Sequence, residues 1–361
     1  MQRLNTFADI KGQFKMGDLR VVKLDFRSTI HLGKNISGIG LEDSLLIAHS
    51  DTLFSCLINA YAEIHSGNPN AVDELLTAFG DGEPPFQISS AFPYRTCWND
   101  LTYYLPKPLV GYPSFYDSTL GPKLKKEYGK SIRNTQLVPI DIFRDWIAGE
   151  EIDEHLPKLK EQNIGSFCTR DIRPQHARDR LTNAASIYHV GLVHFHEGSG
   201  LYFLVELNDK TLLDWKMFET VLHQAGRNGL GGRRSHGNGV FDATVSELTD
   251  DWEELFVSRG QEDFNGFINL SLYLPETFKG LEPVSYQLIP RQGWCYSSVT
   301  ATQTKRKKVT MFSEGSVFWN EPKGILADVT PDNGFTAHKL YRYGIPISLP
   351  IKVLEEKDDI S

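Results

Sequence analysis

The feature of this sequence that most constrains its fold is a glycine-rich stretch, residues 229–239, in which five of eleven residues are glycine. Glycine readily adopts positive φ values, so the stretch predicts a tight loop rather than a helix or strand. Successive N–H groups in such a loop can converge on an anion, and Arg233 and Arg234 add planar donors suited to phosphate oxygens. We therefore predict an RNA or nucleotide phosphate site, with a flexible connector carrying two solvated arginines as the alternative.

The surroundings of the loop exclude two common phosphate motifs. No Gly-Lys-Ser/Thr opens a helix, and Arg234 stands where the third glycine of a dinucleotide-binding fingerprint would be. The order of elements is also reversed, because a predicted helix at Trp215–Ala225 precedes the loop and a predicted strand from Val240 follows it. The predicted RNA-contacting residues of the loop are Gly231, Gly232, Arg233, Arg234, Ser235, His236, Gly237, Asn238 and Gly239.

Composition limits the classes of function. The 361 residues suffice for two domains of roughly 100–200 residues each. The formal net charge of −8 argues against indiscriminate nucleic-acid binding, so any RNA contact must come from local basic patches. No run approaches the roughly 18 apolar residues of a membrane span, and the N-terminus lacks an apolar signal segment. We expect a cytoplasmic protein without membrane contact.

The cysteines and histidines do not predict a metal site or a cofactor. The four cysteines are far apart and include no C-x-x-C pair. His194 and His196 would share one face of a strand, with His189 nearby, but Glu197 would point to the opposite face. That ligand set is thin, so we expect no bound metal.

The first half of the chain predicts a strand at Leu19–Arg27 and a helix near residues 49–64. It also predicts strands at Phe86–Phe92, broken by Pro93, and at Leu101–Leu105, broken by Pro106 and Pro108. The residues His49, Ser50 and Asp51 that start the helix invite a catalytic interpretation. Catalytic triads, however, are assembled in space and not from neighbours in sequence. We expect Ser50 or Asp51 to cap the helix by accepting from its first N–H groups.

The second half repeats the strand–helix–strand order. A strand at Gly200–Leu207 is followed by a helix that Asp214 can cap, then by the glycine-rich loop and a strand at Val240–Val245. We interpret the two halves as a pseudo-repeat of ferredoxin-like, RRM-like α+β units. Further strands are predicted at Phe267–Leu274, Ser285–Pro290, Lys308–Met311 and Ser316–Trp319.

Three segments rich in basic residues need interpretation. Residues 123–133 place Lys125, Lys126 and Arg133 beside an aromatic side chain, which fits an RNA-binding surface or a solvated helix face equally well. Residues 305–308 are expected to form a solvated hairpin tip rather than a phosphate contact. The excursion from about 149 to 185, which contains Arg178 and Arg180, is too long for a simple connector and predicts a functional insertion.

Four of these segments, in this order, resemble the RAMP superfamily of CRISPR-associated proteins, and specifically the Csm-type subunit of type III-A effector complexes that caps the 5′ handle of the guide RNA. The resemblance spans nearly the whole chain. The segments are His49–Ser55, Ser89–Tyr94, Arg178–Thr182 and Gly231–Gly239.

The resemblance implies two ferredoxin-like domains, residues 1–148 and 187–361, separated by a β-hairpin thumb inserted at 149–186. It implies a non-catalytic subunit that grips the 5′ handle of the crRNA, contacts the large polymerase-like subunit and the backbone RAMP subunit, and lies near the target RNA at the thumb. The glycine-rich loop would hold handle phosphates, with Arg178 and Arg180 at the thumb or its base and His49, Ser50 and Asp51 near the RNA.

Two alternatives stay open. Related RAMP proteins include guide-processing endoribonucleases that work without metal through a histidine, for which His31, His49 and His236 are the candidates. We interpret His236 as a hydrogen-bond donor to phosphate rather than a general acid or base, because no second titratable partner is evident. The other alternative is a scaffold whose glycine-rich loop contacts only protein.

Overall fold

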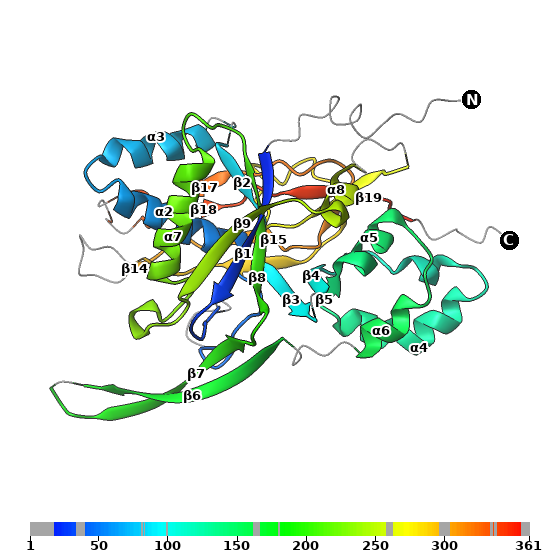
Figure 1. The fold of residues 1–361 in the computed structure, drawn as a ribbon, viewed down its shortest axis with the longest axis horizontal. Helices are drawn as coiled ribbons and strands as arrows, with labels where there is room; N and C mark the ends of the chain where they lie inside the picture. Colours follow the sequence, from blue (N-terminus) through cyan, green and yellow to red (C-terminus); the bar gives the residue numbers. More distant parts are fainter. Residues whose placement is uncertain are drawn as a thin grey trace.

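A computed structural model of the chain describes residues 18–33, 40–80, 82, 84–98, 100–161, 167–179, 181–257, 263–295, 304–332, 335 and 338–354. These residues form a mixed α/β protein with antiparallel sheets (Figure 1). No helix in these ranges is both long enough and apolar enough to cross a membrane.

The largest sheet has β8 (Ser199–Leu207) near its centre. Its strand order is β5-β4-β3-β8-β1-β9, with β2 also paired to β8, and the neighbouring strands are antiparallel. β8 has neighbours on both sides and is buried along nearly its whole length, which explains its almost continuous apolar sequence. The other strands are β1 (Asp18–Phe26), β2 (Phe86–Ile88), β3 (Phe92–Cys97), β4 (Asp100–Pro106), β5 (Leu137–Pro139) and β9 (Phe241–Glu247).

Three helices lie together beside this sheet (Figure 1): α2 (Ser50–Ile64), α3 (Pro69–Gly80) and α7 (Trp215–Asn228). α7 begins where predicted, because the Asp214 carboxylate accepts from the N–H of Met217 at 2.8 Å. Its buried residues Phe218, Val221, Leu222 and Ala225 recur at helical spacing. The helix ends at Gly229, whose φ of 80° favours glycine.

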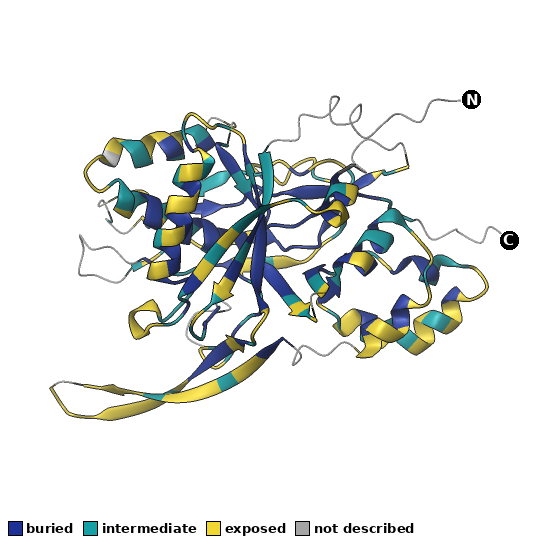
Figure 2. Ribbon diagram, in the orientation of Figure 1, coloured by how far each residue is buried: buried dark blue, intermediate teal, exposed yellow. Residues whose placement is uncertain are grey.

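A helical region follows β4. It contains the short 3-10 helix η1 (Pro113–Tyr116), α4 (Gly121–Asn134), α5 (Ile140–Ala148) and α6 (His155–Glu161). The chain then forms a long antiparallel hairpin from β6 (Cys168–Arg178) and β7 (Ala185–Phe195), each 11 residues long. The hairpin projects from the body and is largely exposed, whereas residues 190–193 at its base are buried (Figure 2). β7 continues past the predicted end of the insertion at 186.

The C-terminal region contains α8 (Asp250–Val257) and several short strands. One four-stranded sheet has the order β11-β16-β10-β19, and β12–β15, β13–β14 and β17–β18 form separate pairs. The bounds are β10 (Gly266–Asn269), β11 (Pro283–Ser285), β12 (Leu288–Arg291), β13 (Trp294–Cys295), β14 (Thr304–Lys305), β15 (Val309–Phe312), β16 (Val317–Phe318), β17 (Leu326–Asp328), β18 (Tyr341–Tyr343) and β19 (Ser348–Ile351).

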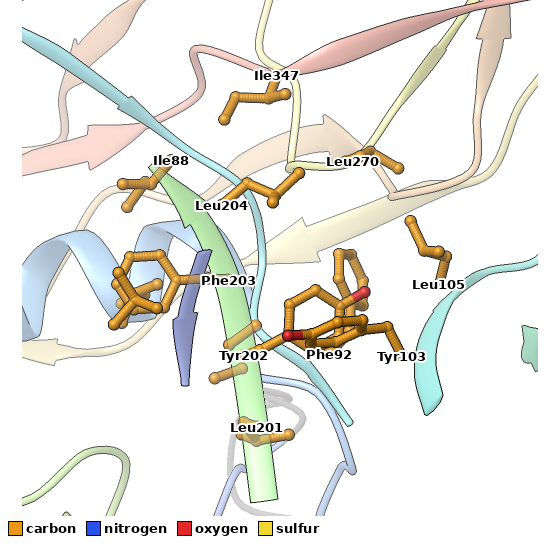
Figure 3. Close-up of a cluster of buried hydrophobic side chains, with 14 of the residues drawn as sticks. Ile88, Phe92, Tyr103, Leu105, Leu201, Tyr202, Phe203, Leu204, Leu270 and Ile347 are labelled. Atoms are coloured by element: carbon orange, nitrogen blue, oxygen red, sulfur yellow. The ribbon is translucent and has the colours of Figure 1, made fainter. Parts of the chain in front are cut away.

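One continuous hydrophobic core joins the large sheet to this C-terminal region. Figure 3 shows Leu204 of β8 close to Ile88, with Leu270 and Ile347 from the C-terminal region on the same side of the sheet. All four side chains are buried to within 2% of full burial. The C-terminal region therefore cannot separate from the sheet without exposing apolar surface that both share.

Four predictions about the fold need correction. Each half was expected to build its own sheet, but β8 and β9 from the second half pair with β1 from the first, so the two halves share one sheet. The predicted strand at 86–92 is two strands, and Pro93 lies inside β3 rather than breaking it. Pairing of β3 with β4 begins only at Tyr94, so the missing N–H of Pro93 interrupts no bond on that side. The predicted strand at 267–274 ends at Asn269.

Candidate nucleic-acid interface

The glycine-rich loop between α7 and β9 is a fixed turn held against residues 29–31. The N–H of Gly232 donates to the carbonyl of His31, and the N–H of Gly239 donates to the carbonyl of Thr29, each at 2.8 Å. Gly231 has φ 88°, and a Cβ there would lie 2.5 Å from the His31 carbonyl oxygen. At Gly239, with φ 79°, a Cβ would lie 2.0 Å from the Leu230 carbonyl oxygen. These glycines are therefore required by close backbone approach as well as by φ.

The polar side chains of the loop divide into structural and exposed groups. Asn238 accepts from the Thr29 hydroxyl at 2.6 Å and donates to the Arg233 carbonyl at 3.3 Å, so it holds the loop together. Arg233 has φ 60°, and its guanidinium lies 5.0 Å from the ring centre of Tyr188 in β7. Residues 234–237, which include the short 3-10 helix η3 (Arg234–His236), are exposed. The loop thus touches the hairpin and presents its tip to solvent.

The loop borders a cavity of about 530 Å³, which we call the basic cavity. Its walls come from segments far apart in the sequence: the stretch after β1, the start of α2, the glycine-rich loop, the β13–β14 region and β18. The lining residues include His31, His49, Asp51, Thr52, Gly231, Gly232, Arg233, Arg234, Gln292, Trp294, Lys305, Arg306 and Arg342. Two predicted sites, the loop and the start of the helix, therefore meet at one place.

The charge of the basic cavity is opposite to that of the chain. Among its lining residues, five carry a fixed positive charge and one is a carboxylate, Asp51. The whole chain has a formal net charge of −8. A concave surface with an excess of cations attracts anions in an otherwise repelling field. The positive residues are Arg233, Arg234, Lys305, Arg306 and Arg342.

The carboxylate of Asp51 does not cap α2, contrary to the sequence prediction. It is 1% exposed and accepts from Arg291 Nε at 2.8 Å and Nη2 at 2.7 Å, and also from Arg342 Nη1. Burial alone would raise its pKa, but the charges of Arg291 and Arg342 lower the pKa of Asp51 far below its ordinary value. The N-cap residue is His49, which makes no side-chain cap hydrogen bond.

His49 and Ser50 also have structural partners. His49 Nδ1 lies 2.8 Å from Glu314 Oε1, and the hydroxyl of Ser90 donates to the same oxygen. Burial opposes ionisation of Glu314, yet the His49 charge and these hydrogen bonds lower its pKa. The Ser50 hydroxyl accepts from the N–H of Leu272 at 3.1 Å. The three residues at the start of α2 therefore tie that helix to the C-terminal region.

The remaining predicted residues lie elsewhere. Lys125, Lys126 and Arg133 are on α4, which does not line the basic cavity. Arg178 ends β6 on the exposed hairpin, and Arg180 lies outside the described residues. His31 is 5% exposed, and its Nδ1 lies 2.7 Å from the Gly191 carbonyl oxygen at the base of the hairpin. The structure therefore joins the loop to α2 but does not bring α4 or Arg178 to the same site.

Sequence reasoning missed part of the basic cavity. Lys305 and Arg306 belong to the basic run that was expected to be a solvated tip, yet both line the cavity. Arg342, which also lines the cavity, is isolated in sequence, as is Arg291, which binds the cavity residue Asp51, and no local pattern marks either arginine. The described residues include no group of three or more His, Cys, Asp or Glu side chains placed to hold a metal ion.

Comparisons with known proteins identify relatives of this chain. Residues 262–351 match the family model of the CRISPR Csm4 C-terminal domain. The chain is 28% identical over 313 residues to the CRISPR system Cms protein Csm4 of Thermococcus onnurineus, a match that covers 86% of this chain and 93% of the relative. It is 25% identical over 385 residues to the protein of that name from Methanocaldococcus jannaschii, with 91% and 96% coverage.

Solved structures share the fold. A chain from the crystal structure of the Csm3-Csm4 subcomplex in the type III-A CRISPR-Cas interference complex superposes with a TM-score of 0.60 at 20% identity. The match covers 92% of this chain and 99% of that one. A chain from the crystal structure of a Csm1-Csm4 cassette in complex with AMPPNP gives a TM-score of 0.56 at 23% identity, with 93% and 99% coverage.

Proposed function

Because the chain belongs to the Csm4 family of CRISPR-associated proteins, we propose that it is a non-catalytic, RNA-binding subunit of a cytoplasmic type III-A effector complex. Its ligand is the repeat-derived 5′ handle of the crRNA. The observation that carries this proposal is the basic cavity, where the glycine-rich loop, the start of α2 and the C-terminal strands place five cations and one carboxylate around a hollow in an acidic chain.

The loop supplies the chemistry for gripping a phosphate backbone. Its exposed tip carries Arg234, Ser235 and His236 as donors, and Arg233 lies beside the hairpin. Arginine binds phosphate oxygens with paired N–H groups, and phosphate contacts fix the register of a nucleic acid without reading its sequence. An acidic body with one basic hollow favours a single bound strand over diffuse binding. Lys125, Lys126, Arg133, Arg178 and Arg180 are proposed as peripheral RNA contacts.

We propose that the hairpin β6–β7 is the thumb. It begins inside the insertion predicted at 149–186, at Cys168, and continues past the end of that insertion to Phe195. Two exposed apolar side chains on it support this role: Leu181 is 95% exposed and Ile187 is 73% exposed. Both side chains are accessible to a partner that meets the hairpin. The thumb would lie beside the guide, near the target RNA.

We propose a ferredoxin-like architecture for the large sheet. The order β1–α2–β3–β8–α7–β9 along the chain, with the sheet order β3-β8-β1-β9 and antiparallel neighbours, supports a single βαββαβ unit. The C-terminal region is then the second unit. In this architecture, strands from both of the predicted domain ranges, 1–148 and 187–361, contribute to the first unit.

The proposed protein partners are the large polymerase-like subunit and the backbone RAMP subunit. The structures with a similar fold contain Csm1 or Csm3 beside Csm4. On this chain, Phe278 and Tyr286 are more than half exposed, and both rings pack near Phe312. Exposed aromatic side chains that cluster in this way favour a protein contact.

The endoribonuclease alternative is less well supported by the geometry. The Nδ1 atoms of His49 and His31 are held by Glu314 and by the Gly191 carbonyl, and both rings are buried, so in each ring only Nε2 is left to exchange a proton with a ribose hydroxyl. We expect the protein alone, incubated with a repeat RNA without metal, to leave no 2′,3′-cyclic phosphate ends. Appearance of such ends, lost in His236→Ala, would support the enzyme instead.

The double variant Arg233→Ala with Arg234→Ala tests the proposed function. We expect the assembled complex that contains it to retain several-fold less crRNA, measured by extracting and quantifying RNA per complex. The matched control is Lys216→Ala with Arg227→Ala, which removes the same charge from exposed positions of α7 that do not line the basic cavity. Equal guide occupancy in the loop variant, the control and the unchanged complex would contradict the proposal.

A further inference from the structure

Two arginines in the basic cavity have hydrogen-bond donors that the described part of the chain does not satisfy. Arg342 is 4% exposed; its Nη1 donates to Asp51, but its buried Nε and Nη2 have no partner there. The buried Nε of Arg306 also has no partner among the described residues. Buried donors of this kind are uncommon because each costs free energy comparable to a lost hydrogen bond.

Charge is unbalanced at the same place. The carboxylate oxygens of Asp51 accept from Arg291 and Arg342, and Arg306 is close enough for its charge to interact with Asp51 and Arg342. The Glu314 carboxylate is engaged by His49. Burial and the neighbouring Arg342 charge lower the pKa of Arg306, although a guanidinium stays charged at neutral pH. The cluster thus carries more positive charge than its carboxylate can neutralise.

The backbone fixes where these donors sit. The N–H of Arg306 donates to the Gly293 carbonyl at 2.9 Å, and Trp294 pairs with Lys305 across β13 and β14. Trp294 is 59% exposed, and the Lys305 ammonium lies 5.0 Å from its ring centre. The volume of about 530 Å³ is within the range of pockets that hold small ligands. An aromatic face therefore stands at the cavity wall next to unsatisfied cationic donors.

We propose that Arg306 and Arg342 form an oxyanion pocket that binds one phosphate group, with the Trp294 ring available to stack the attached base. Two arginines that line one hollow offer enough N–H donors for the several acceptor oxygens of a tetrahedral phosphate, and aromatic rings stack nucleobases in single-stranded RNA. Naming RNA as the source of this phosphate rests on the proposed function. The pocket itself rests on the burial, charge and unsatisfied donors of the two arginines.

Arg306 then has a testable signature: it costs stability when no anion is bound. Replacing it with glutamine removes a partly buried charge that lies near the charge of Arg342. In sodium chloride, we expect the melting temperature of Arg306→Gln to equal or exceed that of the wild-type chain. Inorganic phosphate should raise the melting temperature of the unchanged full chain by about 2 °C or more over chloride at equal ionic strength, and Arg306→Gln should lose this increment. Lys308→Gln, an exposed position outside the cavity, is the charge-matched control and should keep it.

Two results would contradict the proposed phosphate pocket. One is that phosphate does not raise the melting temperature of the wild-type chain over chloride, and the other is that Arg306→Gln keeps this rise. Arg306→Lys keeps the charge without the planar fork and should recover only part of the increment. For the RNA source, complexes carrying Arg306→Gln should contain several-fold less guide than those carrying Lys308→Gln. Equal guide occupancy of these two complexes overturns RNA as the ligand. The Arg233/Arg234 variant tests the proposed function separately, because it leaves Arg306 intact.

Discussion

Two groups of arginines lie in or beside the basic cavity, and they are held in opposite ways. Arg291 and Arg342 are buried and share the Asp51 carboxylate, whereas Arg234 is exposed at the tip of the glycine-rich loop. A buried charge must have a partner within the fold, so the first group is part of what holds α2 to the C-terminal strands. An exposed guanidinium is free of that requirement, so its loss should affect ligand binding far more than stability. The comparison predicts which substitutions unfold the protein and which only release RNA.

The largest expected effect on stability comes from Asp51→Ala. Removing this carboxylate leaves Arg291 and Arg342 buried without their counter-charge, and breaking a buried pair in this way costs about 3–5 kcal/mol. Denaturant unfolding of the full chain measures the change. Asp171→Ala is the control, because its ion pair with Arg173 is on the exposed hairpin and should contribute less than about 1 kcal/mol. Similar losses in the two variants would mean that the buried cluster does not hold the helix in place.

Two glycine-to-alanine substitutions in the glycine-rich loop test its geometry more specifically. Gly237 and Gly239 have nearly the same φ, 78° and 79°, but only Gly239 lacks room for a Cβ. Gly237→Ala should cost only the left-handed conformation, about 1–2 kcal/mol. Gly239→Ala should cost at least about 1 kcal/mol more, because the backbone must shift away from Leu230. Guide occupancy should fall in Gly239→Ala and persist in Gly237→Ala. The reverse order would show that the loop is not a rigid turn.

Acid should weaken the buried contacts to the C-terminal region through Glu314. Its pKa is lowered in the folded state, so its contribution is present above the unfolded pKa of about 4.3 and is lost as the pH falls below it. In that window the unfolded chain binds more protons, and this group adds a slope of up to about 1.4 kcal/mol per pH unit. Glu314→Gln should have a shallower acid limb in unfolding free energy measured from pH 6 to pH 3. An unchanged slope would contradict the pairing with His49.

The smallest effect is expected at the hairpin tip. Leu181 is 95% exposed, so Leu181→Ser should change the unfolding free energy by less than about 0.5 kcal/mol. If the hairpin is the thumb, the same variant should still alter guide or target binding by the assembled complex, measured as RNA occupancy. A large loss of stability would contradict the exposure of this side chain. Unaltered RNA binding would contradict its role in the thumb.

Local patterns predicted the parts of the fold that depend on neighbours in sequence. The alternation in β1, the apolar run of β8, the Asp214 cap and the loop after α7 were all correctly predicted, because helix caps, strand periodicity and glycine turns are decided within a few residues. Strand pairing was not, since β1 and β8 are far apart in sequence and no local signal specifies their register. The expectation of two separate sheets failed for this reason.

The candidate site shows the same division. The sequence alone marked the glycine-rich loop with its paired arginines, and a net charge that restricts RNA binding to a local patch. Only the tertiary structure decided that Asp51 is a buried counter-ion instead of a helix cap, and that Lys305, Arg306 and Arg342 complete the cavity. The physical reason is that the partner of a charge is chosen by distance in space and by burial, and both are set when β12 and β18 pack against the start of α2.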